Sequence, residues 1–431
     1  MFLFDFNWQI QHFLNQFWWP LNSLLLVIAV ITAYLAYKKP IYAAAITVVF
    51  LPGYLFRSYI SWLPFTFLEV LIWLTFLGWM IGKWRFAISD LLASLRGRSW
   101  RLTRYRWPIL LILLGATIGL VFSPDLQAAA GLWKAYFIEP ILFFIVLKNV
   151  VKTENDKKIL LWALGISTLA VSLLAICQKF SGFSIAEPAW TGPENRRVTS
   201  IFTSPNAVGL FLGPIVAIYF GWLLAEIKNL KSTILKLLLI IPALLAILFT
   251  ISQGTWLGLA AAIVFLAYFG WNKKWTTAII VSLIILVLII PMTREIIIPI
   301  ITFQDTSGQN RITLAQLSWQ QLTSSPQNFL LGAGSLGFDQ YQDQARNPLK
   351  IEDLLYPHNI ILNFWSETGL SGLIGLIWLI VIFFKQGFRR YKLLMLGIMA
   401  AMITIIVHGL IDVPYFKNDL AVLFWLIVAL I

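Results

Sequence analysis

Residues 207–226 read AVGLFLGPIVAIYFGWLLAE and carry no charged side chain before Glu226. A run of about 20 apolar residues is long enough to cross the hydrocarbon core of a bilayer as a helix. Similar runs recur along the chain, so we predict an all-α polytopic membrane protein with about 12 or 13 transmembrane helices. The expected spans are near residues 21–37, 42–56, 60–82, 108–123, 129–147, 159–177, 207–226, 237–251, 255–270, 276–291, 359–384, 393–411 and 418–431.

The composition around these runs excludes an ordinary water-soluble protein. The 431 residues are 59% hydrophobic and 12% charged, with a mean hydropathy of +0.82. Soluble domains carry about 25% charged residues, so this chain has about half of the usual charge. Its single cysteine, Cys177, lies in an apolar run, and one cysteine excludes an intramolecular disulfide.

The positive charges separate between the two faces that alternating loops define. The formal net charge is +13, from 32 Lys and Arg against 19 Asp and Glu. One set of loops holds 22 of these cations, the opposite set holds nine, and Lys134 lies within a span. By the positive-inside rule the richer side is cytoplasmic, so most of the basic excess is a topology signal. Membrane lipids are therefore the expected surroundings, and nucleic acid is not implied as a partner.

The predicted organisation is one integral membrane domain in four segments. They are an interfacial N-terminal segment (1–20), transmembrane helices with an external loop at 179–206 (21–291), a large external loop (292–357) and C-terminal transmembrane helices (358–431). Loops longer than about 12–15 residues are commonly functional. The large loop contains RITLAQLSWQQLTSSP, whose apolar spacing predicts a helix that ends at Pro326.

His358 is the histidine with the strongest claim to chemistry. It follows Pro357 at the expected start of a helix, where the helix dipole disfavours a positive charge and keeps imidazole neutral, and therefore basic. It could instead bond a phosphate or cap its helix. The other two histidines, His12 and His408, are interpreted as packed or headgroup-facing side chains.

Outward-facing arginines next to spans run against the positive-inside bias. Arg196, Arg197 and Arg311 are either surface side chains on aqueous loops or guanidinium forks for an anionic ligand such as a phosphate. Asn206 and Asn359 stand at expected helix starts, where they could cap a helix or touch a sugar.

One pair of charges is predicted within the membrane. Lys134 and Glu139 belong to GLWKAYFIEPIL, and intramembrane charges are usually functional. Because a spacing of five residues pairs poorly on an α-helix, we expect their partners on other helices.

Five segments, in order, resemble the O-antigen ligase and O-antigen polymerase family of lipid-linked oligosaccharide transferases. Together with the stretch that precedes the first segment, the resemblance covers roughly residues 130–425. Two positions depart from the pattern: Ser200 stands where many relatives have glycine, and Gln253 where many have arginine, which removes one cation commonly seen there. The segments are RVTSIFTSPNAVGLFL (197–212), SQGTWLGLAAAIVF (252–265), NRITLAQLSWQQLTSSPQNFLLGAGSLGF (310–338), PHNIILNFWSETGLSGL (357–373) and HGLIDVPYFKNDLAVLFW (408–425).

The resemblance implies an inverting glycosyltransferase of the C-type membrane superfamily that uses no metal or other cofactor. Its donor would be a glycan on undecaprenyl diphosphate, and transfer would occur on the outer face of the bacterial plasma membrane. Arg197 and Arg311 would stabilise the diphosphate leaving group, with Arg196 as a helper, and His358 would act as general base. Asn206 and Asn359 complete the expected substrate-binding set. The sequence agrees on the metal, because its external loops hold no Asp-x-Asp and no His/Cys cluster, and Glu352–Asp353 alone is weak support for a cation site.

The acceptor stays open between related reactions. A ligase would use a lipid A core, a polymerase another lipid-linked glycan, and a protein-glycosylating relative a Ser or Tyr hydroxyl. We expect a ligase first and a polymerase second. A solute transporter would need paired broken helices and a midplane site, and a non-catalytic scaffold would leave the external His and Arg set unexplained.

Overall fold

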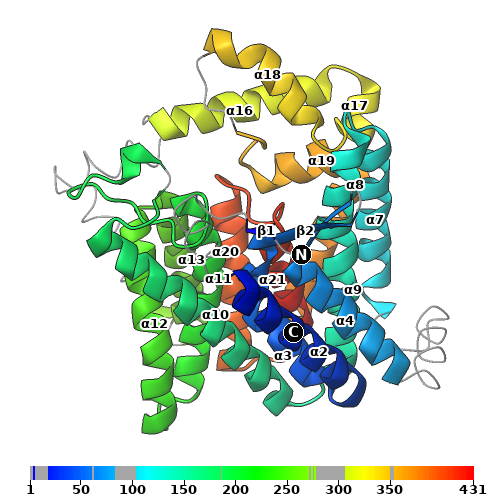
Figure 1. Cartoon of the computed structure of the whole chain (residues 1–431). Helices are drawn as coiled ribbons and strands as arrows, with labels where there is room; N and C mark the ends of the chain where they lie inside the picture. Colours follow the sequence, from blue (N-terminus) through cyan, green and yellow to red (C-terminus); the bar gives the residue numbers. More distant parts are fainter. Residues whose placement is uncertain are drawn as a thin grey trace.

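The apolar runs of the sequence form the helices of a membrane bundle (Figure 1). The computed structural model describes residues 3–4, 18–60, 63–82, 103–185, 187–270, 273–274, 276–277, 306–349 and 354–431. Within these residues seven helical spans are long and apolar enough to cross a membrane, and five shorter apolar helices have 10–17 residues. The prediction of an all-α polytopic membrane protein is confirmed.

Twelve of the thirteen expected spans coincide with these helices, and the remaining one, 276–291, lies almost wholly outside the described residues. The long spans are α2 (Trp18–Lys38), α8 (Leu126–Trp133) continued through the π-helical turn η2 (Lys134–Ile138) into α9 (Glu139–Val150), α10 (Glu154–Ser181), α11 (Pro205–Ala225), α12 (Leu230–Thr250), α13 (Gln253–Gly270) and α19 (Ile360–Arg389). The shorter helices are α3 (Pro40–Val49), α4 (Phe67–Gly82), α7 (Arg106–Val121), α20 (Leu393–Gly409) and α21 (Asn418–Leu430).

The expected spans 42–56 and 60–82 are shortened by a small sheet between them. After α3 the chain forms the 3-10 turn η1 (Leu51–Leu55), then the hairpin β2 (Phe56–Ile60) and β3 (Leu63–Thr66). The strand β1 (Leu3–Phe4) pairs antiparallel with β2 and completes the order β1-β2-β3. Pro52 lies in η1 and Pro64 in β3, and proline lacks the N–H that a continuing helix requires. Apolar composition alone did not reveal these breaks.

The polar ends of the helices meet in two groups, as the loop assignment predicts. At one end the Ser123 hydroxyl, after α7, donates to the Ser335 carbonyl of the large loop at 2.7 Å. At the opposite end Lys158 of α10 and Glu226, which follows α11, form an ion pair of 2.7 Å. We call the first end the external end and the second the basic end.

The described part of the large loop forms three helices that lie above the bundle in Figure 1: α16 (Thr306–Thr323), α17 (Pro326–Leu331) and α18 (Gly337–Leu349). The helix expected around RITLAQLSWQQLTSSP is confirmed as α16, although it ends three residues before Pro326. Pro326 instead begins α17, where Ser325 caps the helix by accepting from the Asn328 N–H. Leu314, Leu317 and Phe338 form a separate small core that holds α16 to α18.

A break in α19 fastens this loop to the bundle. Gly369 has φ +64° and ψ −174°, so the helix is interrupted there. The Ala333 N–H donates to the Ser366 carbonyl at 2.8 Å. A Cβ at Gly369 would lie 2.6 Å from the Leu331 carbonyl carbon, because α17 packs directly against this break. The glycine is therefore needed both for its backbone conformation and for the close approach of the loop.

The first prediction concerns this contact. Gly369→Ala introduces a left-handed alanine and a clash with the α17 backbone, so we expect a loss of stability of at least about 1–3 kcal/mol. Thermal unfolding of the purified protein in detergent measures it. Gly131→Ala is the control, since nothing lies within 4 Å of a Cβ built there. Equal melting temperatures in the two variants would contradict the proposed constraint.

Candidate active site

A cavity of about 450 Å³ opens at the external end of the bundle. It collects residues from the loop after α10, the start of α11, α16, the segment before α19 and the loop after α20. His358, Arg197 and Arg311, which the sequence assigns to catalysis, all line it, as does Asn206. Residues more than a hundred positions apart in the chain therefore share one site. We call it the Arg/His cavity.

Arg197 is held at the joint between α12 and α13. Its backbone N–H donates to the Trp190 carbonyl at 3.2 Å, and its Nε donates to the Thr250 carbonyl at 2.9 Å. Its Nη2 donates to Asn206 Oδ1 at 3.4 Å. These contacts order a half-buried guanidinium at the cavity wall. The side chain therefore loses little conformational entropy when a ligand binds to it.

Arg311 reaches the cavity from the first turns of α16. Its side chain is half-buried and makes no hydrogen bond or ion pair to another residue in the described part of the chain. Because α16 lies above the bundle, Arg311 approaches the cavity from the external loop, whereas Arg197 belongs to the loop between α10 and α11 (Figure 1). A ligand between them would be gripped by both the loop and the bundle.

His358 stands one residue outside α19 and is paired with a carboxylate. The helix begins at Ile360 with Asn359 as its N-cap, so His358 precedes the cap, and its φ is +53°. Its Nδ1 lies 3.3 Å from Oδ1 of Asp412, in the loop after α20. A carboxylate at Nδ1 fixes the tautomer that carries its proton there and leaves the Nε2 lone pair available as a base.

Asp412 lies between two histidines. Its other oxygen, Oδ2, is 3.6 Å from Nε2 of the buried His408. Burial raises the pKa of Asp412, but the adjacent rings of His358 and His408 outweigh it and hold the pKa well below its usual range. Asp412 is therefore ionised at physiological pH. His408, interpreted from sequence as a packed side chain, is buried in α20 but also faces this carboxylate.

Lys417 adds a third cation to the Arg/His cavity. It is the residue before α21, and its Nζ lies 4.1 Å from the ring centre of Phe202 and 3.8 Å from Oδ1 of Asp419. Desolvation by burial lowers its pKa, and the Asp419 carboxylate partly opposes this shift. An anionic ligand placed beside Nζ would favour the charged form of this lysine.

The helix ends reinforce the positive potential of the cavity. Pro205 and Ala207 at the start of α11, and Lys417 and Leu420 at the start of α21, line it. Helix N-termini present unpaired N–H groups and a partial positive charge, which favours a phosphate. With three cations and one carboxylate among its lining side chains, the Arg/His cavity suits an anion.

Two predicted substrate-binding residues are not brought to this cavity. The Arg196 guanidinium donates to the carbonyls of Thr191 and Lys179 and so holds its own loop together. Asn359 accepts from the Ile361 N–H at 3.0 Å and donates to the Leu410 carbonyl at 3.0 Å, so it caps α19. The Arg196 and Arg197 side chains thus bond different segments, Arg196 the end of α10 and Arg197 the end of α12.

A second cavity of about 300 Å³ adjoins the first, and Thr203 and Lys417 line both. Its wall contains Lys134, whose Nζ lies 2.8 Å from Oε2 of Glu69 in α4. The expected partner on another helix is thus confirmed. The same Nζ is 3.9 Å from Oε1 of Glu139, so the expectation of poor pairing at this spacing is wrong. Residues 134–138 form a π turn, in which side chains five apart approach each other.

Asp412 and Lys417 are the site residues that sequence reasoning missed. Both lie in HGLIDVPYFKNDL, between α20 and α21. Lys417 was visible as one of nine outward cations, but neither residue stands beside an arginine or histidine already selected for chemistry. Only the packing of this short loop against the start of α19 brings Asp412 to His358.

The cavity thus brings three cations, a histidine and a carboxylate together at one end of the bundle. Residues 237–377 match the family model for O-antigen ligase, a region that includes Arg311 and His358 and ends before Asp412. This part of the chain is therefore similar to O-antigen ligases, and the resemblance to the O-antigen ligase and polymerase family is confirmed. No curated protein matches the chain. The family supports a glycosyltransferase of ligase or polymerase type in an integral membrane protein.

The second prediction tests the positioning role of Asp412. Asp412→Asn keeps the size of the side chain but removes the charge that orients His358, so we expect glycan transfer to fall about a hundredfold. Turnover by the purified protein measures this. Glu194→Gln, which removes an exposed acid from an external loop, should leave transfer unchanged. Equal activity of Asp412→Asn and wild type would exclude this role, and an altered melting temperature would identify a folding defect.

Proposed function

We propose that this protein transfers an oligosaccharide or polysaccharide from an undecaprenyl-diphosphate carrier to an acceptor hydroxyl on the outer face of the plasma membrane. The reaction would be inverting, independent of metal and of the O-antigen ligase type. The observation that supports this most directly is that Arg197, Arg311 and His358 line one cavity at the end of the bundle that bears the fewest cations in its loops.

The cations of the cavity suit the leaving group. As the bond between the anomeric carbon and the diphosphate breaks, negative charge grows on the departing oxygen. Arg197 and Arg311 provide two guanidinium forks from separate segments of the lining, and Lys417 provides a further ammonium near the start of α21. Cations fixed before the reaction stabilise this charge without reorganising water, which is where the largest gain in rate is expected.

His358 suits the attacking hydroxyl. Its Nε2 would accept the proton that the acceptor loses as its oxygen bonds to the anomeric carbon, and Asp412 would stabilise the resulting imidazolium. The diphosphate leaves from the opposite face of the sugar as an anion held by the arginines. One such displacement inverts the anomeric configuration, and its charges balance without a metal.

The adjoining cavity suits a sugar. Its wall offers the Lys134 and Glu69 pair, and Asn418 Nδ2, which donates to Glu69 Oε1 at 3.0 Å. Tyr54 and Tyr136 line the same space. Paired charges, an amide and aromatic rings can bond hydroxyl groups and cover the apolar face of a pyranose. We propose that a sugar of the acceptor or of the growing glycan lies here.

The polymerase alternative uses the same chemistry with a lipid-linked glycan as acceptor. The transporter alternative has less support. α19 is broken at Gly369, as transporter helices often are, but α17 of the external loop packs directly on the break.

The third prediction removes the proposed leaving-group cation and the proposed base. Arg311→Ala and His358→Ala should each lower transfer by about 10²–10³-fold while the protein still inserts and melts normally. Gln316→Ala, an exposed substitution on the same helix as Arg311, is the control. The assay combines purified protein with a lipid-diphosphate glycan and, in separate arms, a lipid A core or a second lipid-linked glycan. Full activity in both variants would reject the mechanism, and the arm that yields product separates ligase from polymerase.

The fourth prediction concerns the metal. Because the arginines and Lys417 already supply positive charge to the diphosphate, addition of a chelator should leave the transfer rate unchanged. The rate with and without excess chelator, followed by readdition of Mg²⁺ or Mn²⁺, measures this. Loss of activity that a divalent cation restores would overturn the metal-independent mechanism.

A further inference from the structure

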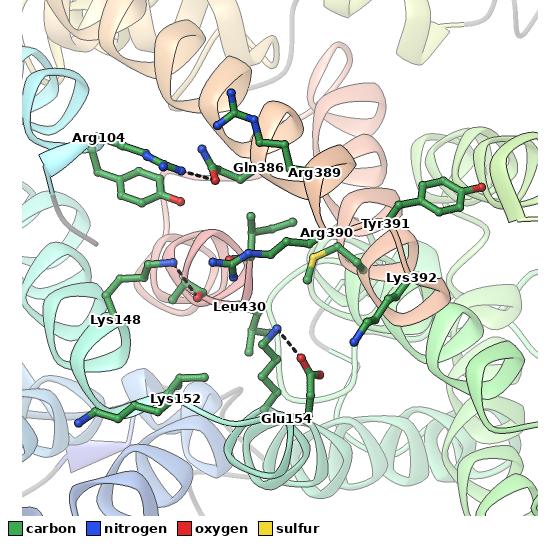
Figure 2. Close-up of a pocket in the computed structure, with 16 residues that line it drawn as sticks. Arg104, Lys148, Lys152, Glu154, Gln386, Arg389, Arg390, Tyr391, Lys392 and Leu430 are labelled. Atoms are coloured by element: carbon green, nitrogen blue, oxygen red, sulfur yellow. Dashed lines mark hydrogen bonds and ion pairs between the residues drawn. The ribbon is translucent and has the colours of Figure 1, made fainter. Parts of the chain in front are cut away.

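A large cavity lies at the basic end of the bundle. It is lined by the last residues of α19, whereas His358 precedes the first residue of that helix. Its volume is about 710 Å³, against about 450 and 300 Å³ for the two external cavities. The ends of α7, α9, α10, α19, α20 and α21 enclose it. Figure 2 shows its polar side chains arranged around the end of α21, near Leu430. We call it the basic cavity.

Its lining side chains carry a strong excess of positive charge. Seven are cationic and one, Glu154, is acidic, and Lys157 already pairs with Glu154 at 3.3 Å. These cations come from three separate stretches of the chain, at residue 104, 148–157 and 389–392, so no single loop explains their convergence. They are Arg104, Lys148, Lys152, Lys157, Arg389, Arg390 and Lys392.

Some of these cations have structural duties. Lys148 donates to the Ala429 carbonyl at 3.3 Å and Arg390 to the Ile431 backbone oxygen at 2.7 Å, so both satisfy acceptors at the end of α21. Arg104 donates to Oε1 of Gln386, as drawn in Figure 2. The oxygens of Gln386 and Ala429 are neutral, so these bonds leave the charges of Arg104 and Lys148 in the cavity.

The remaining three cations of the cavity are not among those that bond these oxygens. Lys152, Arg389 and Lys392 are exposed and form no ion pair with any residue in the described ranges. The charge of the cavity thus calls for an anion from elsewhere.

The positive-inside rule explains why cations are frequent on this face, but it does not require seven of them to meet around one hollow. Mutual repulsion at short range disfavours such convergence unless a counter-ion offsets it. Basic pockets between transmembrane helices at the cytoplasmic boundary have the depth and the donors to receive a lipid headgroup. Arg389, Arg390 and Arg104 offer the planar donor forks that match phosphate oxygens.

We propose that the basic cavity is a binding site for a phosphate-bearing anion, supplied by the headgroup of an anionic membrane lipid. The bound phosphate lies among Arg389, Arg390 and Lys392, with Lys152 on the facing wall. This site is separate from the Arg/His cavity, and its existence does not depend on the glycosyltransferase proposal.

The site also has a structural consequence. α19 runs from the cap beside His358 to Arg389, and α21 runs from Lys417 to the carbonyls that Lys148 and Arg390 bond. An anion in the basic cavity therefore fixes the far ends of the two helices whose near ends carry His358 and Lys417.

The fifth prediction tests the site by native mass spectrometry of the full chain in detergent. Phosphatidylglycerol, phosphatidylcholine and inorganic phosphate are added in separate arms. We expect the wild type to retain phosphatidylglycerol. The combined changes Lys152→Gln, Arg389→Gln and Lys392→Gln should weaken its binding by about tenfold or more. Phosphatidylcholine should bind poorly to both. High salt should weaken the phosphatidylglycerol complex.

A matched triple variant provides the control. Lys228→Gln, Lys231→Gln and Lys385→Gln remove three exposed cations from the same face but outside the cavity, so lipid binding should remain. Equal loss in both triple variants, or equal retention of phosphatidylcholine, would overturn the proposal, as would no binding in any arm. If inorganic phosphate alone binds and raises the melting temperature, the phosphate site stands and the lipid source is rejected. Unchanged melting of the variants shows that folding is not the cause.

Discussion

The hydrocarbon core of the membrane is the constraint on which this structure depends. Because no water is available there, backbone groups are satisfied within helices and polar side chains are excluded unless paired. Within the described bundle the cation Lys134 is held by Glu69 and Glu139. The two charged cavities lie at the ends of the helices.

At those ends, helix termini form part of the walls of both charged cavities. The Arg/His cavity collects the starts of α11 and α21, where the backbone itself favours an anion. The basic cavity instead encloses the end of α21, whose carbonyls are satisfied by Lys148 and Arg390. The three external helices then cover the site, and the interruption of α19 at Gly369 lets them approach closely enough to bring Arg311 to the cavity.

Much of this could be predicted where the signal is local. The spans follow from apolar length, α16 from its spacing of leucines, and the capping of α19 by Asn359 from residue type. The hairpin at 56–66 was not predicted, because its apolar composition resembles that of a span and only the prolines mark the breaks. The pairing of Lys134 with Glu139 was not predicted either, because α-helical periodicity does not reveal a π turn.

The sequence by itself determined the membrane class and the residue types able to bind a diphosphate or accept a proton, since these depend on composition and short spacing. The tertiary structure alone decided which of them meet. It placed Arg197 at the cavity and turned Arg196 into its own loop, it joined His358 to Asp412 across two loops, and it brought Lys417 between two cavities. The physical reason is that such contacts arise from helix packing between distant segments, for which the chain carries no local pattern.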